Sequence, residues 1–189
     1  METIRWEVAV SAPPEVLRAC KKCGAKTAHL SSGLFRVNAR KKSLDIWLIY
    51  RCARCKTTWN LPVFSRIGPK SIPGELLEDF LKNDPALALR CGLDMNLLRR
   101  NGAECALPPF EITGPAADLS REIRVKIGCE TPLKIRLQKI LRQKLGLSAR
   151  SFEKAVLSGK VRLENGGDLS RAMLQKEITV ILGGGHPES

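Results

Sequence analysis

Four cysteines arranged as two close pairs constrain this chain more than any other feature. Two residues separate Cys20 from Cys23, two separate Cys52 from Cys55, and 28 residues lie between the pairs. A Cys-x-x-Cys turn lets both sulfurs point the same way, so two such turns brought together present four thiolates to one tetrahedral ion. The spacing therefore predicts one structural zinc ion per chain, because four protein ligands leave no coordination position for water or substrate.

The spacing alone also leaves iron and disulfides open. Rubredoxin-type electron carriers bind iron in a tetrahedron with a similar pair spacing, but they usually surround it with acidic residues, whereas cations flank these pairs. Disulfides and unligated thiols are disfavoured because the first seven residues lack the layout of a secretory signal, and we expect a cytoplasmic, reducing compartment. The flanking cations are Lys21, Lys22, Arg54 and Lys56.

The chain is also strongly basic. Its 189 residues include 32 Lys and Arg against 19 Asp and Glu, a formal net charge of +13. Residues 1–68 carry +9 (13 basic, 4 acidic), residues 69–133 carry −2 (8 and 10), and residues 134–182 carry +7 (11 and 4). Two basic segments around a near-neutral middle predict an anionic partner, and we expect that partner to be nucleic acid.

Other classes of function lack support in the sequence. No run approaches the roughly 18 apolar residues of a membrane span, so we expect no membrane partner. No P-loop, dinucleotide fingerprint, Ser/His/Asp set or His-Glu-x-x-His motif is present, so we expect no enzymatic activity. We expect His29 to be a surface or hairpin residue. The isolated cysteines, expected to be small buried hydrophobes, are Cys91, Cys105 and Cys129.

Hydrophobic periodicity predicts an α+β chain that begins with a ribbon and continues into helices. Within residues 1–68, alternating apolar residues predict strands, and a hairpin with a basic tip joins the cysteine pairs into a zinc ribbon. Residues 69–130 predict a small helical middle segment and a linker, with helices opened by Pro73, Pro85 and Asp94. Because aromatic residues make up only 5% of the chain, three tryptophans are expected as the large core side chains: Trp6, Trp47 and Trp59.

The segment 131–182 predicts a helix, a second helix, a strand, a turn and a final strand. Thr131 and Pro132 are expected to start the first helix, which ends at Gly146. Ser148 caps the second helix, and the last strand precedes a frayed tail at residues 183–189.

This carboxyl-terminal segment resembles the alpha-L RNA-binding domain of the S-four type of small-subunit ribosomal protein. The resemblance rests on three runs, 136–141, 145–148 and 156–163. It implies a module that binds structured RNA through phosphates, and the expected partner is a structured RNA or the ribosome. The chain departs from the family pattern at Gln138, Ala149 and Lys176-Glu177, and has one extra residue in the 163–166 turn. The implied contact residues are Lys139, Arg150, Lys154, Lys160 and Arg162.

A DNA-binding helix-turn-helix competes with this interpretation. The Leu145 to Ser148 turn followed by an amphipathic helix is also typical of that motif. Arg142 stands where that motif normally has a small residue, and the strands that follow fit the RNA module better. We therefore keep a DNA-binding regulator as the alternative to an RNA-binding protein.

The rest of the chain resembles a bacterial family of zinc-ribbon proteins catalogued as domain of unknown function 1062. The resemblance rests on residues 36–39, 44–52, 58–60 and 83–88. It implies the ribbon fold but supplies no activity, so the predicted function depends on the cysteines and on the charge.

Overall fold

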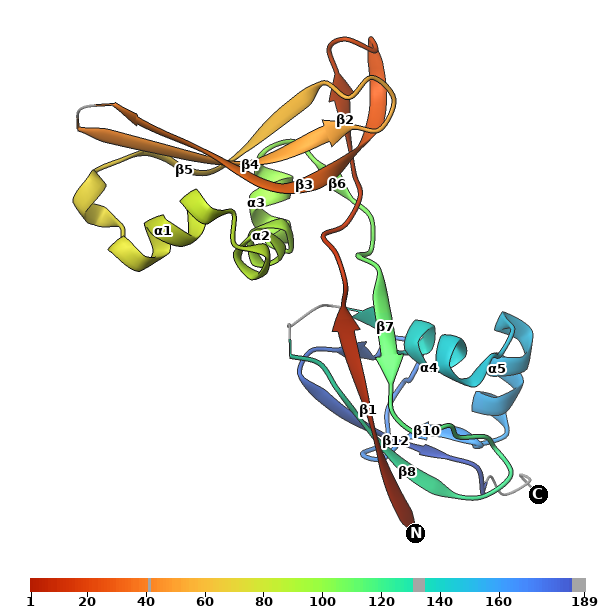
Figure 1. Ribbon diagram of the computed structural model, residues 1–189. Coiled ribbons are helices and arrows are strands. Elements are labelled where there is room, and N and C mark those ends of the chain that lie inside the picture. The colour runs from red at the N-terminus through yellow and green to blue at the C-terminus, as the bar shows by residue number, and fades with distance from the viewer. Residues whose placement is uncertain (41, 131–134, 185–189) are drawn as a thin grey trace. The chain divides into compact units, whose positions relative to one another are not determined.

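The computed structural model of the protein describes residues 1–40, 42–130 and 135–184 (Figure 1). The described residues form a mixed α+β fold with five α-helices and three sheets. They divide into two compact units. Unit 1 combines Met1–Val10 with Phe110–Ser189, and unit 2 is the intervening segment Ser11–Pro109.

Unit 2 contains a five-stranded antiparallel sheet in the order β5-β4-β3-β2-β6. Its three α-helices lie on one face of this sheet (Figure 1). The helices pack there because alternate side chains of β4 point toward this face. Of these side chains, Ile46, Leu48 and Tyr50 are fully buried. They share one core cluster with residues of the helices: Phe80, Leu87 and Leu98. The elements are β2 (Val16–Cys20), β3 (Ala25–Arg40), β4 (Ser43–Cys52), β5 (Thr58–Ile67), η1 (Pro69–Ser71), α1 (Gly74–Lys82), α2 (Pro85–Gly92), α3 (Met95–Arg100) and β6 (Glu104–Cys105).

The predicted helices of the middle segment are confirmed, and aspartate side chains cap the starts of α2 and α3. Asp84 accepts from the N–H of Leu87 at the start of α2, and Asp94 caps α3 in the same way. Asn83 ends α1 in the left-handed conformation, with φ of 56°, and its Oδ1 accepts from the N–H of Phe35 at 2.6 Å. This bond ties the helical layer to β3.

Unit 1 contains a sheet in the order β10-β12-β8-β1-β7 and a small β11-β9 pair. β1 lies between β8, to which it is parallel, and β7, to which it is antiparallel. Helices α4 and α5 bury Leu137, Ile140 and Phe152. The elements are β1 (Glu2–Val10), β7 (Phe110–Thr113), β8 (Ile123–Gly128), β9 (Ile135–Arg136), α4 (Leu137–Leu145), α5 (Ala149–Leu157), β10 (Val161–Leu163), β11 (Met173–Leu174) and β12 (Glu177–Leu182).

This division differs from the predicted segments 1–68, 69–130, 131–182 and 183–189. The first strand, expected in the ribbon, belongs to the sheet of unit 1, because the strands that complete its ladder lie beyond residue 109. The middle helices belong to unit 2, because their apolar faces complete the core of its sheet.

The start of the carboxyl-terminal segment also differs from the prediction. Helix α4 begins at Leu137, after Arg136 as N-cap, and a short strand precedes it. The predicted start at Thr131 and Pro132 lies outside the described residues, as do residues 185–189 of the expected tail. Gly183 continues the sheet edge, since its N–H donates to the carbonyl of Lys160 at 2.8 Å.

Two side chains lie elsewhere than predicted. Trp47, expected in the core, is half-buried and points to the opposite sheet face from its buried neighbours Ile46 and Leu48. His29 is only 3% exposed, and its Nδ1 lies 3.0 Å from the carbonyl oxygen of Thr27. Within the described ranges, no helix has the length and apolar composition that crossing a bilayer requires.

Candidate metal centre

The two cysteine pairs occupy equivalent turns at the ends of strands. β2 ends at Cys20 and β4 ends at Cys52. In each turn the carbonyl of that first cysteine accepts a bond from the N–H four residues later, Gly24 or Lys56, at 3.0 Å. Both donors have left-handed backbones, with φ of 65° at Gly24 and 61° at Lys56. The turns therefore share one geometry, in which both cysteines of a pair face the same side.

Strand order brings the two turns together. β3 lies between β2 and β4 and is antiparallel to both, so Cys20 and Cys52 stand at the same edge of the sheet. Cys20 is opposite Ala25 on β3, and Cys52 is opposite His29. The long β3–β4 hairpin thus closes the 28-residue gap in sequence.

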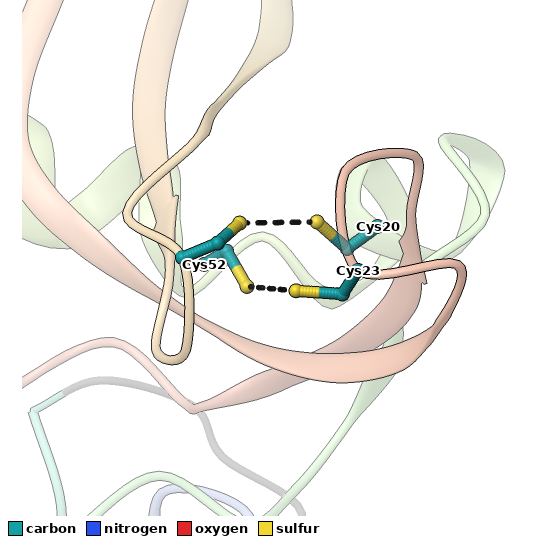
Figure 2. A group of neighbouring side chains, drawn as sticks. Cys20, Cys23 and Cys52 are labelled. Atoms are coloured by element: carbon teal, nitrogen blue, oxygen red, sulfur yellow. Dashed lines mark hydrogen bonds between the residues drawn. The ribbon is translucent and has the colours of Figure 1, made fainter.

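The four sulfurs form a compact cluster at this edge (Figure 2). The Sγ atoms of Cys20 and Cys55 are 3.5 Å apart, and those of Cys23 and Cys52 are 3.9 Å apart. All four lie within 4.8 Å of one another. A tetrahedral site with zinc–sulfur bonds of about 2.3 Å has sulfur–sulfur edges of about 3.8 Å. The donor set therefore fits a tetrahedral metal ion, as its spacing predicted.

Hydrogen bonds favour the thiolate form of two of the four cysteines. The backbone N–H of Cys55, together with the Thr27 hydroxyl 3.3 Å away, lowers the pKa of Cys52 to about 5. The Thr57 hydroxyl, 3.2 Å from Cys55 Sγ, lowers the pKa of Cys55. The contact with Cys55 raises the pKa of Cys23 to about 12. Cys52 and Cys55 therefore favour the thiolate form, which is the form that ligates a metal cation.

The sequence did not single out Arg18, which stands two residues before Cys20 on the same side of β2. Its guanidinium lies 3.9 Å from the ring centroid of Trp59, which is a cation–π contact. Burial lowers the pKa of Arg18, while the charge of Cys20 opposes that shift. The period of a strand, which puts residues i and i+2 on one face, is the signal that links Arg18 to the cysteines.

Exchanging the residues at the two left-handed positions is expected to change stability in opposite directions. Lys56→Gly should stabilise unit 2 by about 1 kcal/mol, because a left-handed conformation costs about 1–2 kcal/mol with a side chain. Gly24→Ala should destabilise it by a similar amount. No atom lies within 4 Å of the added Cβ, so the cost is conformational rather than steric. Thermal unfolding of metal-loaded protein measures both effects.

Arg54→Gly is the matched control, since Arg54 lies in the same turn but is not among the positive-φ residues of the described chain. Arg54→Gly should lower the thermal stability of unit 2. Equal effects of glycine at positions 54 and 56 would contradict the backbone explanation.

The other cysteines do not join the cluster. Cys91 and Cys105 are half-buried and Cys129 is buried, and no disulfide forms among the described residues. Burial raises the pKa of Cys91 to about 11. His29, next to the site on β3, contacts the edge of the Trp59 ring and contributes no donor atom to the cluster.

The predicted nucleic-acid contacts lie in unit 1, and all of them except Arg162 are exposed to solvent. Arg150 and Lys154 stand on α5, opposite the buried Phe152 and Ala155. Lys160 lies just before β10. None of these three cations forms an ion pair with another described residue.

The other two predicted contact residues, Arg162 and Lys139, interact with neighbouring residues of unit 1. The Arg162 guanidinium donates to the carbonyls of Gly159 at 2.9 Å and Gly183 at 3.2 Å, and pairs with Glu122 at 2.7 Å. Lys139, on α4, is exposed, and its Nζ lies 5.8 Å from the ring centroid of Phe110. Arg162 therefore has an internal role that the sequence did not reveal.

A basic groove along α4 was also missed. Its volume is about 470 Å³, and three cations at intervals of three residues contribute to it. The spacing i, i+3, i+6 signals such a helical face. The groove is lined by Arg136, Gln138, Lys139, Arg142, Gln143 and Leu147.

Comparison with known protein families finds a match over most of the chain. The family model described as "Protein of unknown function (DUF1062)" matches residues 37–166. The match includes Cys52, Cys55 and the predicted nucleic-acid contacts, whereas Cys20 and Cys23 lie before it. No curated protein and no solved structure matches the chain.

Proposed function

The chain belongs to the DUF1062 family, and from this premise we propose a cytoplasmic, non-enzymatic protein that holds one structural zinc ion and binds structured RNA. The observation that carries the RNA part is the set of exposed cations Arg150, Lys154 and Lys160, which have no carboxylate partner among the described residues. Cations left without partners by their own fold are available to phosphate groups.

The zinc part rests on the donor set. Four thiolates are soft ligands, and a closed set of four favours zinc in a structural role. The predicted zinc-ribbon form agrees with the two equivalent turns at one sheet edge. Exposed cations around the cluster, Lys21, Lys22 and Arg54 among them, distinguish it from an iron electron carrier surrounded by acid.

The RNA part rests on unit 1. Its carboxyl-terminal half contains helix α4, helix α5, strand β10 and strand β12 in the order expected for an alpha-L-like module, with the short strand β11 between the last two. Lys139 and the groove on α4 extend the basic surface, and the exposed α5 cations add to it. Arg162 supports this surface by anchoring β10 to Glu122 and Gly183. We therefore assign the main phosphate contacts to Arg150, Lys154 and Lys160.

A competition experiment tests this function. At fixed salt, an RNA hairpin is expected to bind about tenfold or more tightly than duplex DNA of the same sequence, a difference of about 1.4 kcal/mol or more. The reason is that an alpha-L-like surface matches A-form shape and phosphate spacing rather than the DNA major groove. Fluorescence anisotropy with unlabelled competitors measures the ratio. Preference for one particular DNA duplex would instead support the helix-turn-helix regulator.

A further inference from the structure

Unit 2 has a sheet face that its own helices leave open. In the part of the unit that the structure describes, α1, α2 and α3 all lie on the other side of the sheet (Figure 1). The alternating side chains of β4 that face away from those helices are half-buried or exposed rather than buried. We define the open face by Leu30, Leu34, Arg36, Trp47, Ile49 and Arg51.

A tryptophan lies at the centre of the open face. Trp47 is on β4, directly opposite Arg36 on β3 and Pro62 on β5. Neither Trp47 nor Ile49 belongs to the core cluster of unit 2 or packs against it. A large aromatic side chain left half-buried on an open sheet face provides a flat surface for stacking.

Apolar and cationic groups extend this surface toward the cysteines. Leu30 is 48% exposed and Leu34 is 42% exposed, and Arg51 lies opposite Leu30 across the β3–β4 pair. Together they border a groove of about 400 Å³ at the cysteine end of the sheet. Lys56 adds a second cation to the groove wall. The groove therefore offers apolar contact beside positive charge.

The positive charge of unit 2 indicates which class of ligand the open face would bind. Unit 2 contains 17 basic and 8 acidic residues, a net charge of +9. Arg36 and Arg51 form no ion pair with another described residue. On β4 the one carboxylate of this face, Asp45, accepts from the N–H of Arg66 at 2.9 Å and so has a backbone partner. The occupant must therefore be an anion with flat apolar parts.

We propose that the open face binds single-stranded nucleic acid, with bases stacking on Trp47 and phosphates contacting Arg36 and Arg51. Unpaired bases expose their π-faces, and stacking on an aromatic side chain contributes about 1–3 kcal/mol per base without regard to sequence. This site is separate from the RNA surface assigned to unit 1. The two surfaces would let one chain hold both a folded and an unpaired part of an RNA.

The test uses the full zinc-loaded chain and a fluorescently labelled oligouridylate, which has no secondary structure. Trp47→Ala should weaken binding about 5- to 150-fold, the loss of about 1–3 kcal/mol of stacking. Trp47→Phe should restore most of the affinity, because a phenyl ring still stacks. Arg36→Ala with Arg51→Ala should lower the salt slope of the binding constant by about 0.7 for each phosphate that is no longer neutralised.

Arg99→Ala with Arg100→Ala is the matched control, because these exposed arginines lie on α3 of the same unit. Unchanged zinc content and melting temperature exclude misfolding of a variant. Equal loss in the control, or no loss in the Trp47 and Arg36/Arg51 variants, would overturn the proposal. So would polyglutamate binding as tight as oligouridylate with the same dependence on Trp47, which would assign the face to acidic protein segments. Failure of hairpin binding by unit 1 leaves these outcomes unaffected.

Discussion

Cys52→Ser is expected to abolish zinc binding and to unfold unit 2 at 25 °C, while unit 1 stays folded. Structural zinc contributes an apparent binding free energy of about 10–16 kcal/mol, comparable to the whole stability of a domain at about 5–15 kcal/mol. Cys52 is fully buried and is bonded to Thr27, so serine leaves a buried polar group in place of a ligand. Hydrogen exchange should show rapid labelling of residues 11–109 and protected amides in β8 and β12.

Cys105→Ser is the control, since Cys105 is half-buried in unit 2 but lies outside the cluster. It should keep one zinc per chain by elemental analysis, and a strong chelator should then unfold unit 2 first. Zinc retention by the Cys52 variant, or a red, iron-containing wild-type protein with a reversible one-electron wave, would contradict the structural zinc site.

Replacing Arg150, Lys154 and Lys160 together by alanine is expected to weaken binding of an RNA hairpin about 100-fold at 0.15 M salt. Because three phosphates would no longer be neutralised, the slope of log K against log salt should also fall by about 2 to 3. The exposed side chains lie away from the buried Phe152 and Ala155, so the melting temperature should change little. Titrations at several salt concentrations measure the slope.

Arg162→Ala separates a phosphate contact from a structural one. Because its guanidinium bonds to Gly159, Gly183 and Glu122, this variant should lower the stability of unit 1 with little change in salt slope. Arg99→Ala with Arg100→Ala should leave hairpin binding unchanged. A slope that falls equally in all three variants would show that the RNA grip is diffuse.

The sequence predicted local features well and long-range partners poorly. The four cysteines, the helices of residues 73–102, and the two helices and strands β10 and β12 after residue 136 all depend on spacing within a few turns or strands. The short strand β11 was not predicted, because its partner β9 lies far from it in the sequence. The pairing partner of the first strand does not depend on local spacing, because β1 pairs with β8, more than 100 residues away. Alternating apolar residues predict a strand but do not indicate which strand it pairs with.

Side-chain environments were missed for the same reason. Trp47 was expected in the core because it is large and apolar. Side chains alternate between the two faces of β4, and Trp47 lies on the open face, away from the buried residues. The role of Arg18 was not predicted because its cation–π partner, Trp59, is distant in sequence and meets it only in the folded sheet. Arg162 was assigned to phosphate because Glu122 and Gly183 are distant in sequence.

The insertion of unit 2 between β1 and β7 sets the order in which the chain can fold during synthesis. The ribosome releases β1 first, but both neighbours of β1 emerge only after residue 109. An unstructured loop of about 100 residues would oppose their pairing with about 4 kcal/mol of closure entropy. Folded unit 2 removes most of that cost, because its own ends meet where the N–H of Ser11 donates to the carbonyl of Pro109 at 3.2 Å. Metal supply would thereby control how fast unit 1 of a nascent chain matures, although the four clustered cysteines all lie in unit 2.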